Sequence, residues 1–105
     1  MKLLENAIEP QGTQNLLDND KVNIKVLKLA EDLTKATITL YALQEYTFTA
    51  RSGILTTMVG TGIISTATDS IEINMFNKVA LERNDKVTIT NNQAIPLVME
   101  FISAN

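Results

Sequence analysis

The sequence has no cysteine and no histidine among its 105 residues. Without cysteine the chain can form no disulfide, no thiol nucleophile and no thiolate metal site. Without histidine it lacks the commonest transition-metal ligand and the commonest general base of enzymes. There is no tryptophan either, and aromatic residues make up only 5% of the chain, which argues against nucleic-acid recognition by base stacking. These absences exclude much of the chemistry on which small enzymes depend.

The chain also lacks an excess of positive charge and a long apolar run. Nine Lys and Arg residues against twelve Asp and Glu give a net charge of −3, whereas nucleic-acid binders are usually basic. No apolar stretch approaches the roughly 20 residues of a membrane-spanning helix. Residues 1–8 are too short and too polar for the core of a signal peptide. We therefore expect a single cytoplasmic domain with no nucleic-acid or membrane partner.

β-Branched residues, by contrast, are abundant: 13 Thr, 11 Ile and 6 Val account for 30 of the 105 positions. Such side chains suit the pleated, half-buried surface of a sheet. From Val22 onward, apolar and polar residues alternate in short segments separated by turn residues. The segments are 22–27, 36–41, 46–50, 54–59, 63–66, 71–74, 79–81, 87–90 and 97–102. This pattern predicts eight or nine strands of an all-β sandwich or barrel, without the helical crossovers of a parallel sheet.

Residues 1–20 show no sustained period and contain Pro10 and Gly12. We interpret them as an N-terminal arm, with a short turn near residues 14–18, that precedes a β domain over 21–105. Five apolar residues of the arm would be costly to leave in water, at about 25 cal/mol per Å². They are Leu3, Leu4, Ile8, Leu16 and Leu17. We expect them to lie against the domain or against the edge strand of a second chain, which predicts a homodimer.

Residues 46–102 resemble the cupin superfamily of small jelly rolls. The stretch ILTTMVGTGIIST is similar to the family's strand that ends at a Gly-x-Gly-type turn, and LERNDKVTITNNQAIPLVMEFIS has the spacing of its second motif. With the final glycine of the first motif placed on Gly60, its two histidines and glutamate fall on Tyr46, Phe48 and Gly53. The last histidine of the second motif falls on Ile95. The resemblance implies a single cupin-like jelly-roll β-sandwich or barrel that has lost the metal ligands and holds no metal and no cofactor.

A candidate ligand site follows from the same segment. Tyr46 and Phe48 are two residues apart on an expected strand, so both side chains point to one face. The resemblance places that face inside the barrel, together with Ile95. With the Tyr46 hydroxyl as a polar group, these residues and Arg51 would form a small apolar pocket for a small-molecule ligand. Plain core packing is the simpler interpretation of the same cluster.

Other polar motifs are better explained by local structure than by chemistry. The acidic pairs Glu31-Asp32 and Glu82 with Asp85 lie in expected turns, where Asp85 can accept hydrogen bonds from backbone amides. The sequence 60–62 (GTG) is followed by no Gly-Lys-Ser/Thr and no helix, so we interpret it as a turn or bulge rather than a phosphate loop. We identify no catalytic residue.

Three functions remain open at this point. The first is a non-catalytic, metal-free cupin-like domain that acts through small-ligand binding or homo-oligomerisation, and we favour it. The second is a metal-independent enzyme of cupin fold, such as a sugar isomerase or epimerase or a nucleoside-processing enzyme. Its candidate groups would be Arg51, Glu45, Tyr46 and Glu100. The third is a structural β-protein of a phage or prophage particle, because small Thr- and Asn-rich β domains also occur there.

The residue types lead to a prediction about metal content. Purified protein should contain no stoichiometric Fe, Mn, Ni or Zn, because the usual nitrogen and sulfur ligands are missing. Elemental analysis after dialysis against a chelator tests this. One metal ion retained per chain would contradict the prediction.

Overall fold

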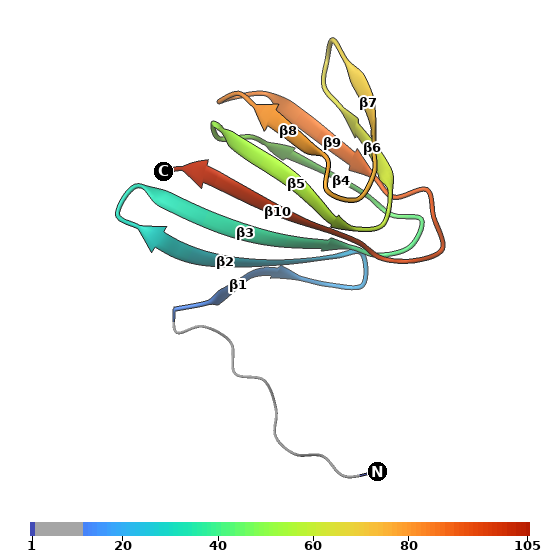
Figure 1. Cartoon of the computed structure of the whole chain (residues 1–105), viewed down its shortest axis with the longest axis horizontal. Helices are drawn as coiled ribbons and strands as arrows, with labels where there is room; N and C mark the ends of the chain where they lie inside the picture. The colour runs from blue at the N-terminus through green and yellow to red at the C-terminus, as the bar shows by residue number, and fades with distance from the viewer. Residues whose placement is uncertain (2–11) are drawn as a thin grey trace.

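A computed structural model describes Met1 and residues 12–105, and every regular element within them is a strand (Figure 1). The strands are β1 (Gln14–Asp18), β2 (Val22–Ala30), β3 (Leu33–Leu40), β4 (Glu45–Thr49), β5 (Gly53–Val59), β6 (Gly62–Ser65), β7 (Ser70–Ile73), β8 (Lys78–Leu81), β9 (Lys86–Thr90) and β10 (Leu97–Ala104). Each of the nine expected segments falls on one of these strands. No helix within the described residues is long and apolar enough to cross a membrane.

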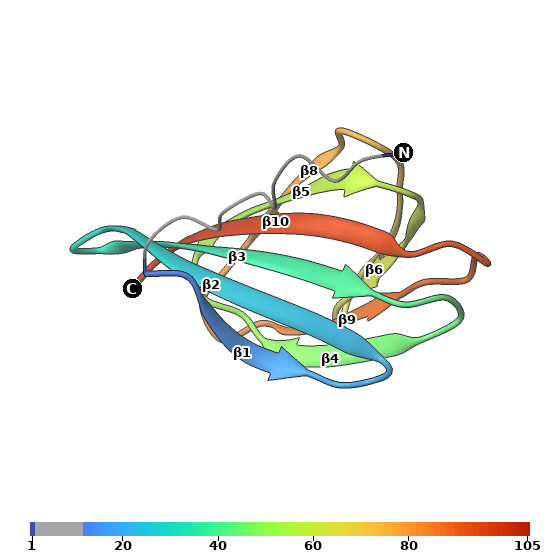
Figure 2. The ribbon, with the colours of Figure 1, turned by 90° about the horizontal axis from the view of Figure 1, so that it is seen from below.

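The strands form two sheets that face each other (Figure 2). The larger sheet has six strands in the order β1-β2-β3-β10-β5-β8, and the smaller has four in the order β4-β9-β6-β7. All strand pairs are antiparallel. Two facing antiparallel sheets, between which the chain crosses repeatedly, confirm the prediction of an all-β jelly-roll sandwich.

The arm expected over residues 1–20 is in part a strand, because β1 joins the six-stranded sheet at its edge. It pairs with β2 of the same chain, with Gln14 opposite Val26 and Asp18 opposite Asn23. The β1–β2 turn is held by Asn19, whose Oδ1 accepts hydrogen bonds from the backbone amides of residues 21 and 22. A short turn was expected near residues 14–18; these residues are a strand, and the turn follows directly after them.

The apolar residues of the arm have different surroundings. Leu17 packs against the core, whereas Leu16 is 67% exposed. Leu3, Leu4 and Ile8 lie outside the described residues.

Strand β10 shows how the alternating pattern places the core between the sheets. Leu97, Met99 and Phe101 are buried on its inner face. The residues between them, Val98 and Glu100, lie on the outer face of the six-stranded sheet, because successive side chains of a strand point to opposite sides. The same alternation in the other long strands builds a single apolar core.

The segment 60–62 is a tight connection between β5 and β6, as predicted. Gly60 has φ of 90°, a left-handed conformation that glycine adopts without strain. A Cβ atom on Gly62 would lie 2.6 Å from the carbonyl oxygen of Thr90, so only glycine fits there. Both glycines serve the backbone path, which is the structural role expected of them.

Asn91 is a polar residue buried in the structure, with 1% of its surface exposed. Its side-chain nitrogen donates hydrogen bonds to the carbonyl oxygens of Leu40, Tyr41 and Ile95 at 3.0, 3.1 and 2.8 Å. Its Oδ1 accepts one from the amide of Gln93 at 3.0 Å. The side chain therefore joins the end of β3 to the loop between β9 and β10.

Removing this amide should destabilise the fold. Asn91→Ala removes the donor of three carbonyl groups, one buried and two partly buried, and we expect a loss of about 3 kcal/mol in the free energy of unfolding. Denaturant unfolding measures this. The matched control is Asn92→Ala at the neighbouring exposed position, where we expect a change below about 0.5 kcal/mol. Equal midpoints for the two variants would contradict the role assigned to Asn91.

Candidate functional site

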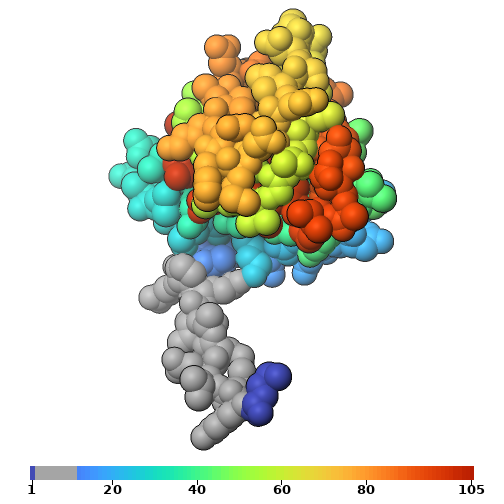
Figure 3. All heavy atoms as spheres, turned by 45° about the vertical axis from the view of Figure 1, so that its right-hand side comes forward, coloured from blue at the N-terminus to red at the C-terminus, as the bar shows by residue number. Residues whose placement is uncertain are grey.

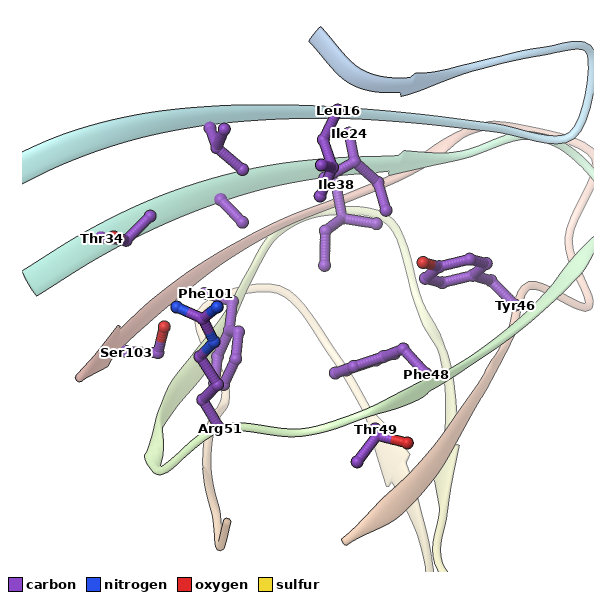
Figure 4. Close-up of a pocket in the computed structure, with 12 residues that line it drawn as sticks. Leu16, Ile24, Thr34, Ile38, Tyr46, Phe48, Thr49, Arg51, Phe101 and Ser103 are labelled. Carbon is purple, nitrogen blue, oxygen red and sulfur yellow. The ribbon is translucent and has the colours of Figure 1, made fainter. Parts of the chain in front are cut away.

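A cavity of about 400 Å³ lies between the sheets on the side where β1 and β4 form their edges. Figure 4 shows its lining. The six-stranded sheet contributes Leu16, Ile24, Val26, Thr34, Ala36, Ile38, Phe101 and Ser103, and the opposite wall consists of Tyr46, Phe48, Thr49 and Arg51. The volume is near the lower end of the range of small-molecule sites, about 300–1,000 Å³.

Small side chains create this space within an otherwise filled core. Thr34 and Ala36 lie on β3, and Ser103 lies on the neighbouring β10, all lining the cavity. The registers place Ser103 opposite Thr34 and Phe101 opposite Ala36. The cavity thus lies over the part of the sheet where the inward positions of β3 and β10 carry shorter side chains than leucine or isoleucine.

The facing wall is aromatic. Tyr46 and Phe48 alternate with exposed residues along β4 and both turn inward. Their rings stack with centroids 5.8 Å apart, and the Phe48 ring packs against Phe101 at 6.2 Å. Burial raises the pKa of the Tyr46 hydroxyl above its usual value, so the group remains a neutral donor at physiological pH. Figure 4 shows this hydroxyl pointing into the cavity.

Arg51 is the one charged residue in the cavity lining of the described chain. It follows the buried Ala50, whose amide and carbonyl are bonded to the backbone of residues 84 and 85 and anchor this segment. The Arg51 guanidinium donates a hydrogen bond to Oδ1 of Asn105 at 3.3 Å. The Thr34 hydroxyl donates to the same oxygen. Asn105 thus joins two polar side chains at one end of the cavity.

Three of the four predicted ligand residues line this cavity: Tyr46, Phe48 and Arg51. Ile95 does not, and its expected place inside the barrel is wrong. Its side chain is 56% exposed on the loop between β9 and β10, which forms part of the surface in Figure 3. The reason is that residues 92–96 leave the sheet before β10 begins at Leu97, so Ile95 is not on a strand.

The sequence pattern missed the opposite wall of the cavity. Thr34, Ala36 and Ser103 were not predicted to line a site. The available signal was the short side chain at successive inward positions of two strands that the register pairs. Strand order, which the sequence does not give, is needed to see that these positions meet.

Acidic residues lie away from the cavity. Glu100 is on the outer face of β10, where its carboxylate is 3.8 Å from the ammonium of Lys35. Glu45 is exposed at the start of β4. Asp85 holds its turn as predicted, since its Oδ2 accepts a hydrogen bond from the amide of Glu82 at 3.2 Å. No carboxylate among the residues that the structure describes lines the cavity.

The side chains present do not fit a metal ion. Phe48 and Gly53 offer no donor atom, and Tyr46 is a single phenol. A Cβ atom on Gly53 would lie 2.4 Å from the carbonyl oxygen of Ile102 and 2.9 Å from the Phe101 ring, so the position has no room for a side chain. Within the described part of the chain, no group of three or more Asp and Glu residues is placed to bind a metal.

The fold is similar to that of solved protein structures, although no sequence comparison finds a match. No model of a known protein family matches the chain, and no curated protein matches it in sequence. Solved structures do. A cupin-2 domain protein from Rhodospirillum rubrum is similar with a TM-score of 0.72 and 10% identity, over 100% of this chain and 77% of that one.

Two further structures agree. A cupin domain from Bordetella pertussis has a TM-score of 0.68 and 11% identity over 85% of this chain and 98% of that one. The Cupin_2 domain of an XRE family transcriptional regulator from Enterobacter cloacae has a TM-score of 0.70 and 10% identity over 79% and 95%. At these identities the similarity concerns the fold alone. It agrees with the resemblance of residues 46–102 to the spacing of the cupin motifs. The chain has the cupin jelly-roll fold without the metal-ligand residues of its motifs.

Proposed function

We propose that the protein is a non-catalytic, metal-free module that binds a small molecule in the cavity between its sheets. The observation that carries this proposal is the cavity itself: it is mostly apolar and is lined by three aromatic rings and a few convergent polar groups. That combination is typical of small-molecule sites. Tyr46, Phe48 and Arg51 are the contact residues on one wall, and Ile24 and Ile38 are contact residues on the other.

The lining favours binding over catalysis. Of the four groups that a metal-independent enzyme could use, only Arg51 and Tyr46 line the cavity, whereas Glu45 and Glu100 lie elsewhere. General acid–base chemistry needs two groups with separated pKa values near the reacting atoms. Tyr46 is a weak acid whose pKa is raised further by burial. The described cavity therefore has an orienting cation and hydroxyl donors but no general base.

Filling part of the cavity should weaken binding without disturbing the fold. We expect 1-hexanol, a neutral apolar probe, to shift the methyl NMR signals of Ile24 and Ile38 in the wild-type protein. Ala36→Leu places extra volume in the cavity and should weaken this binding at least fivefold, because the probe and the new side chain compete for the same space. Titration followed by NMR gives the affinities.

The matched control is Ala104→Leu at an exposed position of β10. It should leave the affinity unchanged. The absence of any shift in the wild-type protein at millimolar probe would refute the proposal, as would equal binding by the Ala36→Leu variant.

We also propose that the chain self-associates as a homodimer. The support is a row of side chains on the outer face of the six-stranded sheet, where the registers align Leu27, Lys35, Ile102, Ile54 and Ala80 across five strands. Ile54 and Ile102 are 44% and 39% exposed. Adjacent apolar residues on a sheet face that no described strand covers favour contact with a second copy.

Sedimentation equilibrium tests the dimer. The full chain should sediment as a dimer at tens of micromolar, and Ile54→Lys should shift it to monomer, because a lysine would be buried unpaired in the interface. Leu43→Lys, at an exposed turn away from this face, is the control and should remain dimeric. A monomeric wild-type chain would exclude the homodimer, and a dimeric Ile54→Lys variant would exclude this face.

A further inference from the structure

The polar groups of the cavity are not spread evenly but gather at one end. The registers place Ser103 between Thr34 on β3 and Gly53 on β5, and Arg51 is two residues before Gly53. Figure 4 shows the Arg51 guanidinium beside Thr34 and Ser103. A cation and two hydroxyl groups therefore meet at this end, which we call the polar end.

The rest of the cavity is apolar. Ile24, Ile38 and Phe48 line the part between the polar end and Tyr46. Two polar side chains lie on this side in Figure 4: the Tyr46 hydroxyl points into the cavity, and Thr49 is exposed at its rim. A ligand that fills the space must therefore place a hydrocarbon body against these side chains and a polar group at the other end.

The charge at the polar end is not neutralised within the described residues. No described carboxylate lies within ion-pair distance of Arg51, and the partner of its guanidinium there is the neutral amide oxygen of Asn105. An arginine has five N–H donors, so most remain available. A carboxylate matches this planar group better than an amide does, because it carries a full negative charge and can accept two parallel hydrogen bonds.

We infer that the ligand is a small amphipathic carboxylate whose anionic group binds Arg51 at the polar end and whose apolar body lies against Ile24, Ile38 and Phe48. This inference rests on the proposed ligand-binding function and specifies its chemical class. The acidic net charge of −3 would otherwise repel an anion, so the affinity depends on this one local cation. Arg51 is exposed to water, which limits the size of the effect.

Three probes of equal chain length distinguish two questions: whether the cavity binds a ligand, and which head group it prefers. Hexanoate, 1-hexanol and hexylamine share the apolar body and differ in the charge of the head group. At pH 7 we expect hexanoate to bind the wild-type protein about tenfold more tightly than 1-hexanol, from a charge-assisted hydrogen bond in partial solvent, and hexylamine to bind most weakly. NMR titration of the full chain measures all three affinities.

Variants at Arg51 test the residue itself. Arg51→Gln should reduce the hexanoate affinity to within twofold of the affinity of the same variant for 1-hexanol. Arg51→Lys, which keeps the charge but not the planar fork, should give an intermediate preference. Arg83→Gln, on the exposed turn between β8 and β9, is the charge-matched control and should keep the full preference.

The affinities distinguish failure of the carboxylate inference from failure of the proposed ligand binding. If 1-hexanol binds in the cavity and hexanoate binds no better, the carboxylate class is wrong and the ligand-binding function stands. If the preference for hexanoate survives in Arg51→Gln, the assignment of Arg51 is wrong. If none of the probes binds the wild-type protein, the proposed function fails together with this inference.

Discussion

The buried amide of Asn91 fixes the position of β4 relative to β3, and the cavity depends on that position. Among the described strands β4 pairs only with β9, so no other described strand of its sheet holds its other side. Asn91 supplies the link, because its side chain bonds Leu40 and Tyr41 at the end of β3 and its backbone amide bonds Gln44 just before β4. Asn91 thus helps to position the aromatic side chains of β4 at the start of the strand, and the backbone bonds of Ala50 hold its end. A buried amide with all its hydrogen bonds satisfied gives a defined geometry that apolar packing alone does not.

The second requirement for the cavity is a shortage of side-chain volume on the facing sheet. Protein interiors are close-packed, so a space of about 400 Å³ beside a filled core needs a physical cause. Thr34, Ala36 and Ser103 provide it at paired positions of β3 and β10. The same chain fills the space between the sheets with leucine, isoleucine and methionine farther along these strands. The cavity is therefore confined to the part of β3 and β10 where the inward side chains are short.

Much of the fold was predictable from the sequence, and the site only in part. Period-two alternation identifies strands because burial on one face of a sheet demands it, and it gave the correct inward direction for Tyr46 and Phe48. It failed for Ile95, because an apolar residue in a loop has no period to mark it as exposed. It also missed β1, because this exposed edge strand has no alternation of buried and exposed residues. The wall formed by β3 and β10 depends on pairing between residues about 70 positions apart, which local patterns do not carry.

The tight contact of Gly53 with β10 bears on how this jelly roll could be turned into a metalloprotein. Placing a glutamate at that position would push its Cβ into the backbone of residues 102 and 103 and into the Phe101 ring. A designer who restored the histidines of the first motif at positions 46 and 48 would still lack the third ligand of that motif until β10 was moved outward. Such a movement would also disturb the pairing of β10 with β3, since the two strands form eight residue pairs. In this scaffold, installing a metal centre is a problem of backbone redesign rather than of side-chain replacement.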